Sequence, residues 1–207
     1  MSVLERMLGR EPDDTPASNS GPAWLDLSLM RKRDLKDGVL ETESSAYPVP
    51  WSPGVFQSEI EQMRAGTRHY LTARRIDVDP IGAPKKSGKQ RGQIIGHAGL
   101  WFTVDEAHVT NIAVHPDARR AGVATALMLA LADEALRRGC SAWTLEVRAS
   151  STGAQELYRT FGFAPAGIRK HYYDNVEDAI VMWCHDIQTK EYAERLDVLR
   201  VALEDTP

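Results

Sequence analysis

The second half of the chain alternates segments of strand character with amphipathic segments of helical spacing. This alternation, with short connections, is typical of α/β domains, in which helices cover a sheet. The clearest helix carries an apolar stripe and stops at Gly139, after Arg137 and Arg138. The predicted elements are a strand over His108–Val114, a helix over Gly122–Arg138, a strand over Ala142–Val147, a helix over Thr152–Phe161, and strands over Ala166–Tyr172 and Asp178–Asp186.

The first half and the end of the chain add further elements around this pattern. Ser52 followed by Pro53 is a typical helix start, because Ser caps free backbone N–H groups and Pro suits the first helical position. The other predicted elements are a strand over Trp24–Met30, a short helix capped by Asp34 or Asp37 that ends before Pro48, strands over His69–Ile76 and Gln93–Val104 joined by a polar loop over Asp77–Gly92, and a helix over Thr189–Leu203.

Composition divides the chain into three parts. A chain of 207 residues buries about 70% of its unfolded surface in one core, so no metal or disulfide is needed to hold it. Residues 10–22 are rich in Asp, Ser, Pro and Thr without apolar periodicity. We therefore expect a flexible leader over residues 1–22, one domain over 23–187 and a helical extension over 188–207.

Charge and targeting signals narrow the function classes. The 25 Lys and Arg against 29 Asp and Glu give a net charge of −4, without a long basic run, which disfavours nucleic-acid binding. The longest apolar stretch, Val123–Ala132, is too short to span a bilayer, and no export signal is recognisable. Cys140 and Cys184 lie in apolar patterns, so we expect two buried thiols in a reducing compartment, the cytoplasm.

The strongest local signal for a ligand lies at residues 119–124, between a strand and the long helix. Free N–H groups and the positive end of the helix dipole make a helix start suitable for an anion. Gly122 and Ala124 allow close approach to the main chain, and Arg119 and Arg120 add positive charge. A diphosphate would fit, although a solvated basic loop is an equally common reason for such a pattern.

Two other site types are disfavoured by spacing. Gly82 and Gly88 are separated by five residues and Gln90 follows Lys89, so the polar loop is not a P-loop. The six histidines show no grouping typical of a metal site, and neither cysteine has the surroundings of a nucleophile.

Several blocks, in order along the chain, resemble one family. Arg119, Gly122 and Ala124 match the coenzyme A loop Q/R-x-x-G-x-G/A of the GNAT superfamily of N-acetyltransferases. The blocks at 111–114, 145–150, 157–158, 161–163 and 169–173, and the Pro-Val-Pro-Trp-Ser segment at 48–52, look like the RimI-type ribosomal-protein alanine N-acetyltransferases. The resemblance spans about residues 24–186.

The resemblance implies a twisted mixed sheet flanked by helices, with acetyl-CoA entering a cleft between two splayed central strands. In this family Ile112, Ala113 and Val114 would offer backbone groups to the pantetheine arm and the acetyl carbonyl. The diphosphate would lie on the loop and helix start formed by Arg119, Arg120, Ala121, Gly122, Val123, Ala124 and Thr125. Ser151 stands where the family usually has an Asn that contacts coenzyme A.

Glu146 is the candidate base. Strand alternation places Trp143, Leu145 and Val147 on one face and Glu146 on the other, so its carboxylate can face a polar cleft. Spacing alone favours an exposed carboxylate paired with Arg148. The resemblance favours the base, acting through water, because a protonated amine cannot attack a thioester.

Tyr158 is the candidate acid, placed to protonate the departing thiolate of coenzyme A. A tyrosine keeps its proton at pH 7, as a donor must. Spacing alone favours a core aromatic, since Phe161 follows three residues later. The resemblance favours the acid.

The sequence therefore predicts an enzyme that acetylates a protein N-terminus. The implied acceptor is the alanine N-terminus of small-subunit ribosomal protein number eighteen, or another protein N-terminus, with acetyl-CoA as cosubstrate and no metal. An α-amine is the easier acceptor, because its reference pKa lies about 2.4 units below that of lysine, which corresponds to about 3 kcal/mol. The alternatives are a small-molecule amine or antibiotic acetyltransferase and a catalytically silent sensor that binds coenzyme A.

Overall fold

A computed structural model describes residues 21–77 and 92–204 of the chain. The predicted leader, apart from its last two residues, and nearly all of the predicted polar loop lie outside the described residues. Within these ranges the chain forms a seven-stranded sheet in the order β1-β2-β3-β4-β5-β7-β6. The strands are β1 (Leu25–Leu29), β2 (Arg68–Arg75), β3 (Gln93–Phe102), β4 (Glu106–Val114), β5 (Ala142–Arg148), β6 (Ala164–Tyr173) and β7 (Glu177–Cys184).

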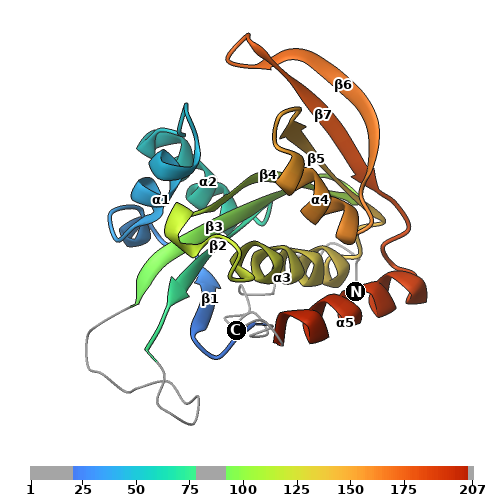
Figure 1. The fold of residues 1–207 in the computed structure, drawn as a ribbon, viewed down its shortest axis with the longest axis horizontal. Coiled ribbons are helices and arrows are strands. Elements are labelled where there is room, and N and C mark those ends of the chain that lie inside the picture. The colour runs from blue at the N-terminus through green and yellow to red at the C-terminus, as the bar shows by residue number, and fades with distance from the viewer. Residues whose placement is uncertain (1–20, 78–91, 205–207) are drawn as a thin grey trace, which may run out of the picture.

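Helices cover both faces of this sheet (Figure 1). The helix α3 runs under the centre of the sheet with α5 beside it, and the β6–β7 hairpin extends beyond the rest of the sheet. The helices are α1 (Val39–Ala46), α2 (Pro53–Arg64), α3 (Val123–Arg137), α4 (Thr152–Thr160) and α5 (Lys190–Glu204), with short 3-10 helices η2 (Lys32–Leu35) and η3 (Pro116–Ala118).

Strand alternation divides the core into two apolar clusters. On β2, Leu71 joins the cluster under α3, whereas the neighbouring Tyr70 joins the cluster under α1 and α2. The larger cluster continues into α5 through Tyr192, Leu196 and Leu203. The predicted C-terminal helix therefore shares the main core, while the predicted boundaries at 22/23 and 187/188 stay predictions.

The predicted order of elements is confirmed, with ends that differ by a few residues. The Ser52 hydroxyl accepts a hydrogen bond from the Val55 amide at 3.4 Å, as expected for the cap of α2. The Thr189 hydroxyl accepts one from the Tyr192 amide at 3.3 Å, at the start of α5. Cys140 and Cys184 are buried free thiols, as predicted.

The predicted cap of the first helix is wrong. The N-cap of α1 is Gly38, not Asp34 or Asp37. Asp34 lies inside η2, where its carboxylate accepts a hydrogen bond from the Arg31 amide at 2.8 Å and pairs with Arg74 at 2.6 Å. Capping propensity alone could not anticipate this, because Arg74 comes from a distant strand.

The central strands separate partway along their length. β4 and β5 are the only parallel neighbours among the described strands, and they pair only from Glu106–Ala142 to Val109–Leu145. Beyond this point each strand continues on its outer side alone, to Val114 and Arg148. The predicted splay is therefore present, and it opens a gap in the middle of the sheet.

Candidate active site

A cleft of about 730 Å³ occupies this gap. Its lining joins the end of β4, the start of α3, the end of β5 and α4. Every residue predicted to bind the cofactor lines the cleft except Ala121, and both predicted catalytic residues line it as well. The predicted residues found there are Ile112, Ala113, Val114, Arg119, Arg120, Gly122, Val123, Ala124, Thr125, Ser151, Glu146 and Tyr158.

Two tyrosines reach into the gap from opposite sides. Backbone groups of alternate residues point to alternate neighbours in a sheet, and the His115 amide bonds to Ile95 on β3. Ile112 and Val114 therefore turn their backbone groups toward the gap. The Tyr47 hydroxyl donates to the Ile112 carbonyl, and the Tyr173 hydroxyl donates to the Glu146 carbonyl at 3.0 Å.

The loop before α3 has the backbone shape of an anion site. Arg120 and Gly122 both have left-handed conformations, with φ of 65° and 77°, and Gly122 is the N-cap of α3. Glycine adopts this conformation without the steric cost that a Cβ brings. Among the described residues, Arg119 and Arg120 form no ion pair. Two arginines without an ion pair in the described ranges, next to the free amides of a helix start, suit a diphosphate.

Tyr158 lies in the wall of the cleft with its side chain 6% exposed. Its ring packs edge-on against Phe163, with centroids 5.9 Å apart. Burial raises the pKa of its hydroxyl, and the nearby hydroxyls of Tyr47 and Tyr173 raise it further. Because its pKa is raised, the hydroxyl keeps its proton at neutral pH. It has no hydrogen-bond partner in the described part of the chain, so it can donate to a ligand.

The Glu146 carboxylate lies on the sheet face opposite α3. It does not pair with Arg148, which contacts Asp174 and Glu177 instead, so the alternative left open by spacing is wrong. The carboxylate is 6% exposed and lies 2.7 Å from His108 Nε2 and 3.1 Å from the Arg169 guanidinium.

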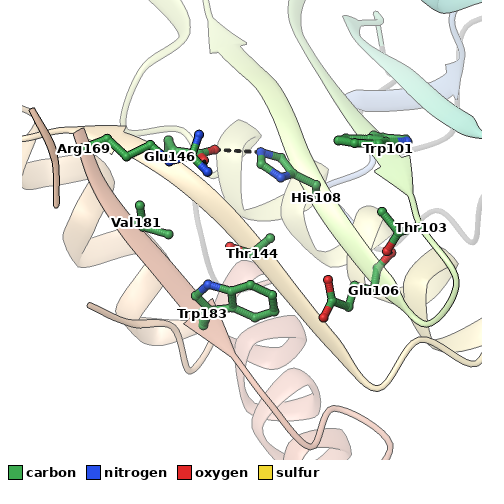
Figure 2. A pocket seen from close by; sticks show the side chains of 9 residues that line it. All are labelled: Trp101, Thr103, Glu106, His108, Thr144, Glu146, Arg169, Val181 and Trp183. Atoms are coloured by element: carbon green, nitrogen blue, oxygen red, sulfur yellow. Dashed lines mark hydrogen bonds and ion pairs between the residues drawn. The ribbon is translucent and has the colours of Figure 1, made fainter. Parts of the chain in front are cut away.

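Around that carboxylate is a second, smaller pocket, which we call the His108 pocket (Figure 2). It has a volume of about 200 Å³ and lies over β3, β4, β5, β6 and β7. Its lining consists of Trp101, Thr103, Glu106, His108, Thr144, Glu146, Arg169, Val181 and Trp183. Glu146 thus borders the cleft on one side of the sheet and this pocket on the other.

Ser151, the predicted substitute for the family's Asn, is the N-cap residue of α4. Its side chain makes no capping hydrogen bond. The turn before α4 is held by Glu177, which accepts hydrogen bonds from the Ser150 amide at 2.9 Å and the Ser150 hydroxyl at 2.5 Å. These bonds and the Arg148 contact lower the pKa of Glu177 to about 2.

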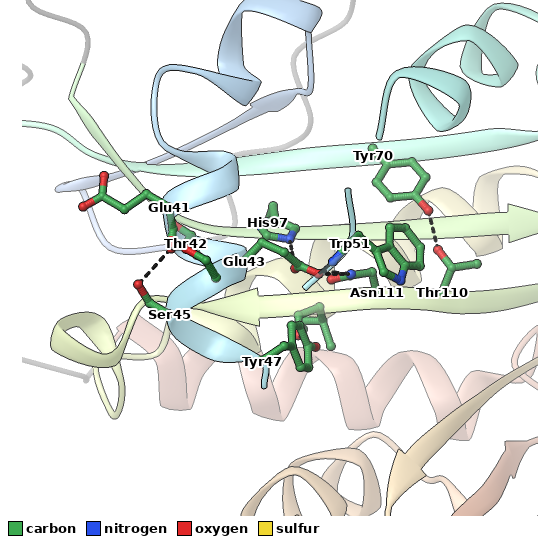
Figure 3. Close-up of polar contacts among 12 residues, drawn as sticks. Glu41, Thr42, Glu43, Ser45, Tyr47, Trp51, Tyr70, His97, Thr110 and Asn111 are labelled. Atoms are coloured by element: carbon green, nitrogen blue, oxygen red, sulfur yellow. Dashed lines mark hydrogen bonds and ion pairs between the residues drawn. The ribbon is translucent and has the colours of Figure 1, made fainter. Parts of the chain in front are cut away.

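A buried polar cluster positions the segment between α1 and α2 (Figure 3). The Glu43 carboxylate is bonded to the Trp51 amide at 2.9 Å, to His97 Nε2 at 3.0 Å and to the Asn111 amide group at 3.3 Å. This cluster ties α1 to β3 and β4, and the segment that carries Tyr47 begins directly after α1. Nothing in the local sequence marked Glu43 as buried, since only the tertiary contact with the sheet reveals it.

Sequence reasoning missed four side chains at the two pockets. Tyr47 and Tyr173 carry the hydroxyls in the gap, and His108 and Arg169 hold the Glu146 carboxylate. One signal for His108 was present in the sequence. Strand alternation places Ala107 and Val109 on the apolar face and His108 on the opposite face. Its pairing with Glu146 depends on the parallel register of His108 with Thr144.

Known proteins share this fold and much of this sequence. The ribosomal protein bS18-alanine N-acetyltransferase of Escherichia coli (strain K12) is 45% identical over 159 residues, covering 75% of this chain and 94% of that protein. The protein of the same name from Haemophilus ducreyi is 34% identical over 148 residues, covering 70% of this chain and 89% of that protein. The crystal structure of the ribosomal-protein-S18-alanine N-acetyltransferase from E. coli superposes with a TM-score of 0.63 at 32% identity, covering 78% of this chain and 94% of that chain.

The family model described as the acetyltransferase (GNAT) family matches residues 36–163, a range that contains the splayed strands, the loop before α3 and Tyr158. This range, together with the identity to the E. coli and H. ducreyi enzymes, shows that the chain is an acetyltransferase and belongs to the GNAT family.

Proposed function

We propose that this enzyme transfers the acetyl group of acetyl-CoA to the α-amine of a protein N-terminus, with the alanine N-terminus of ribosomal protein bS18 as acceptor. The observation that carries the proposal is the 45% identity to the E. coli enzyme of that name, spread over 94% of its length. GNAT acetyltransferases use acetyl-CoA, and a cleft of about 730 Å³ lined by Arg119 and Arg120 supports that cosubstrate here.

Each end of the cosubstrate has a proposed set of contacts in the cleft. Arg119, Arg120 and the helix start at Gly122 would hold the diphosphate. The backbone groups of Ile112 and Val114 that face the gap would hold the extended pantetheine arm in the manner of a neighbouring strand. In this arrangement the protein contributes position and polarity, while the thioester supplies the activated acetyl group.

Proton transfer is divided between the two sides of the sheet. Tyr158, in the cleft, would protonate the departing thiolate. The side that bears the Glu146 carboxylate would receive the acceptor amine and its proton. The family resemblance predicts Glu146 as the base, and its carboxylate lies 2.7 Å from His108 Nε2.

The test is acetylation of defined amines by the purified protein. We expect coenzyme A thiol release, and a mass gain of one acetyl group, with a peptide that carries the N-terminus of bS18. The matched control is the same peptide with its N-terminus already acetylated, which leaves only side-chain amines.

Three outcomes contradict the proposal in different ways. Acetylation of the blocked peptide at lysine would move the acceptor to side chains. Turnover with small amines but with neither peptide would favour a small-molecule acetyltransferase. Binding of acetyl-CoA without turnover on any amine would favour a silent sensor.

The compartment follows from the acceptor and stays a prediction. Ribosomal proteins are available in the cytoplasm, which is where we propose that the enzyme acts. Over residues 21–77 and 92–204, the helices are too short or too polar to cross a bilayer. The same residues contain no group of three or more side chains arranged to hold a metal ion.

A further inference from the structure

Both oxygens of the Glu146 carboxylate are already occupied. His108 Nε2 lies 2.7 Å from one oxygen, and the Arg169 guanidinium lies 3.1 Å from the other. The hydrogen bond from His108 lowers the pKa of the carboxyl, Arg169 lowers it further, and burial opposes them. A carboxylate held in this way is a weak proton acceptor for an ammonium group.

The contact with Glu146 fixes which nitrogen of His108 carries the proton. An ionised carboxylate only accepts hydrogen bonds, so Nε2 must be the N–H donor. In the neutral ring the lone pair is then on Nδ1. Figure 2 shows Nδ1 on the ring edge away from Glu146, and among the described residues it has no hydrogen-bond partner. The His108 side chain is 25% exposed and lines the pocket.

We propose that His108 is the proton acceptor for the amine, and that Glu146 is the positioning residue that orients the ring and stabilises its charged form. The arrangement is that of a carboxylate–histidine pair, in which the acid fixes the tautomer and the imidazole accepts the proton. This inference rests on the proposed function, because it needs an amine acceptor that approaches from the His108 pocket.

The protons that the amine loses and the thiolate gains are transferred by groups on the two sides of the sheet. The acceptor ammonium loses one proton to His108 Nδ1, and the freed nitrogen lone pair attacks the thioester carbon. The carbon–sulfur bond breaks, and the sulfur takes a proton from Tyr158. The second proton of the nitrogen restores Tyr158 through water, and His108 returns its proton to solvent.

The charged groups around His108 come from several strands. The nearest is Glu146 on β5, and Glu106 on β4 lines the same pocket. The cations are Arg169 on β6, paired to Glu146 itself, and Arg68 on β2, which lies over the Trp101 ring and is paired to Glu59 of α2 at 2.6 Å. The other lining residues are Trp101, Thr103, Thr144, Val181 and Trp183, none of which is an acid or a base in the accessible pH range.

The first test is the pH dependence of turnover. His108→Gln should lower kcat on the order of a hundredfold at neutral pH, remove one ionisation from the acid limb of the kcat/KM profile, and leave acetyl-CoA affinity nearly unchanged. The matched control is His185→Gln, a histidine that stacks on Trp183 outside the pocket and should leave the profile unchanged. Retention of the wild-type acid limb in His108→Gln would overturn the proposal.

A second measurement tests whether His108 and Glu146 act together or independently. If Glu146 acts through His108, the double variant His108→Gln with Glu146→Gln should be about as slow as the slower single variant. If the rate loss of the double variant equals the product of the two single losses, the two residues act independently and the pairing is overturned. Free imidazole should restore at least tenfold activity to His108→Ala, which a merely structural histidine would not permit.

The third measurement needs no acceptor. Nitrogen-15 spectra of the histidine side chains, assigned with His108→Gln, should show neutral His108 protonated on Nε2. Protonation on Nδ1 would overturn the proposal. Because this result is independent of the amine, a wrong acceptor contradicts the proposed function alone, whereas a wrong tautomer contradicts the role of His108 alone.

Discussion

At the scale of single residues, Gly122 meets two requirements, a left-handed backbone and space for an anion at the helix start. Two substitutions can separate them. Its φ of 77° disfavours any side chain, and it stands at the free amides of α3. Gly122→Glu should abolish acetyl-CoA binding in calorimetry, because a carboxylate would stand beside the predicted diphosphate site.

Gly122→Ala is the matched control for the backbone. It brings the conformational cost of about 1–2 kcal/mol without the negative charge, so it should keep measurable affinity. Unchanged affinity in a folded Gly122→Glu variant would remove the phosphate site from this loop.

Tyr158 can be tested by removing a single oxygen. If its hydroxyl protonates the thiolate, Tyr158→Phe should keep the fold and lower kcat on the order of a hundredfold, with little change in acetyl-CoA affinity. Steady-state kinetics and thermal melts measure both effects. A fully active Tyr158→Phe enzyme would contradict the proposed role of Tyr158 as the acid.

The packing role of the same ring has its own control. Tyr158→Ala should cost about 3 kcal/mol or more of stability, as for other buried aromatics, because the ring packs against Phe163 in the main core. The two variants therefore distinguish an acid from a core residue.

At the scale of elements, β3 depends on a glycine that has no room for a side chain. A Cβ on Gly99 would lie 2.1 Å from the Tyr70 ring. That ring cannot easily move, because its hydroxyl is bonded to Glu59 at 2.8 Å and to Thr110 at 2.6 Å. Gly99→Ala should therefore destabilise the fold by about 1–3 kcal/mol, seen as a lower Tm.

The matched control is another strand glycine. A Cβ on Gly167 of β6 would meet nothing within 4 Å, so Gly167→Ala should change stability by less than about 0.5 kcal/mol. An equal Tm for the two variants would contradict the close packing of Gly99.

The elements also show what the sequence could and could not predict. Local patterns were enough for α2 and α3, where a Ser-Pro start and a long apolar stripe specify the helix without help from neighbours. They failed at the start of α1, where the acid that resembled a cap pairs instead with Arg74. The same limit applies to the site. The loop before α3 is a local motif, whereas the contacts of Glu146 with His108 and Arg169 depend on three strands meeting.

At the scale of the whole molecule, stability should depend on a largely buried histidine that does not line the cleft. His69 on β2 is 14% exposed, and burial lowers its pKa to about 4, although Glu134 of α3 lies 3.6 Å away and opposes the shift. In the unfolded chain the pKa is about 6.5. Between these values the unfolded state binds more protons, so stability is full above about pH 6.5 and falls as the pH drops toward 4.

The size of this effect can be measured. Protonation of His69 in the unfolded chain should lower the free energy of unfolding by about 2 kcal/mol between pH 7 and pH 5. Urea unfolding of wild type and His69→Gln over this range should show a smaller loss in the variant. Equal losses in the two proteins would assign the acid sensitivity to other groups.

The gap between β4 and β5 gives the folded sheet two inner edges. Sheet edges normally lie at the periphery, where unpaired backbone groups face water. Here the hydroxyls of Tyr47 and Tyr173 cap the Ile112 and Glu146 carbonyls at these edges. The Val114 amide, which turns toward the same gap, should exchange its hydrogen with solvent quickly in the free enzyme and slowly once a ligand lies along β4. Hydrogen exchange at this one amide would then report, in real time, how much of the enzyme is loaded.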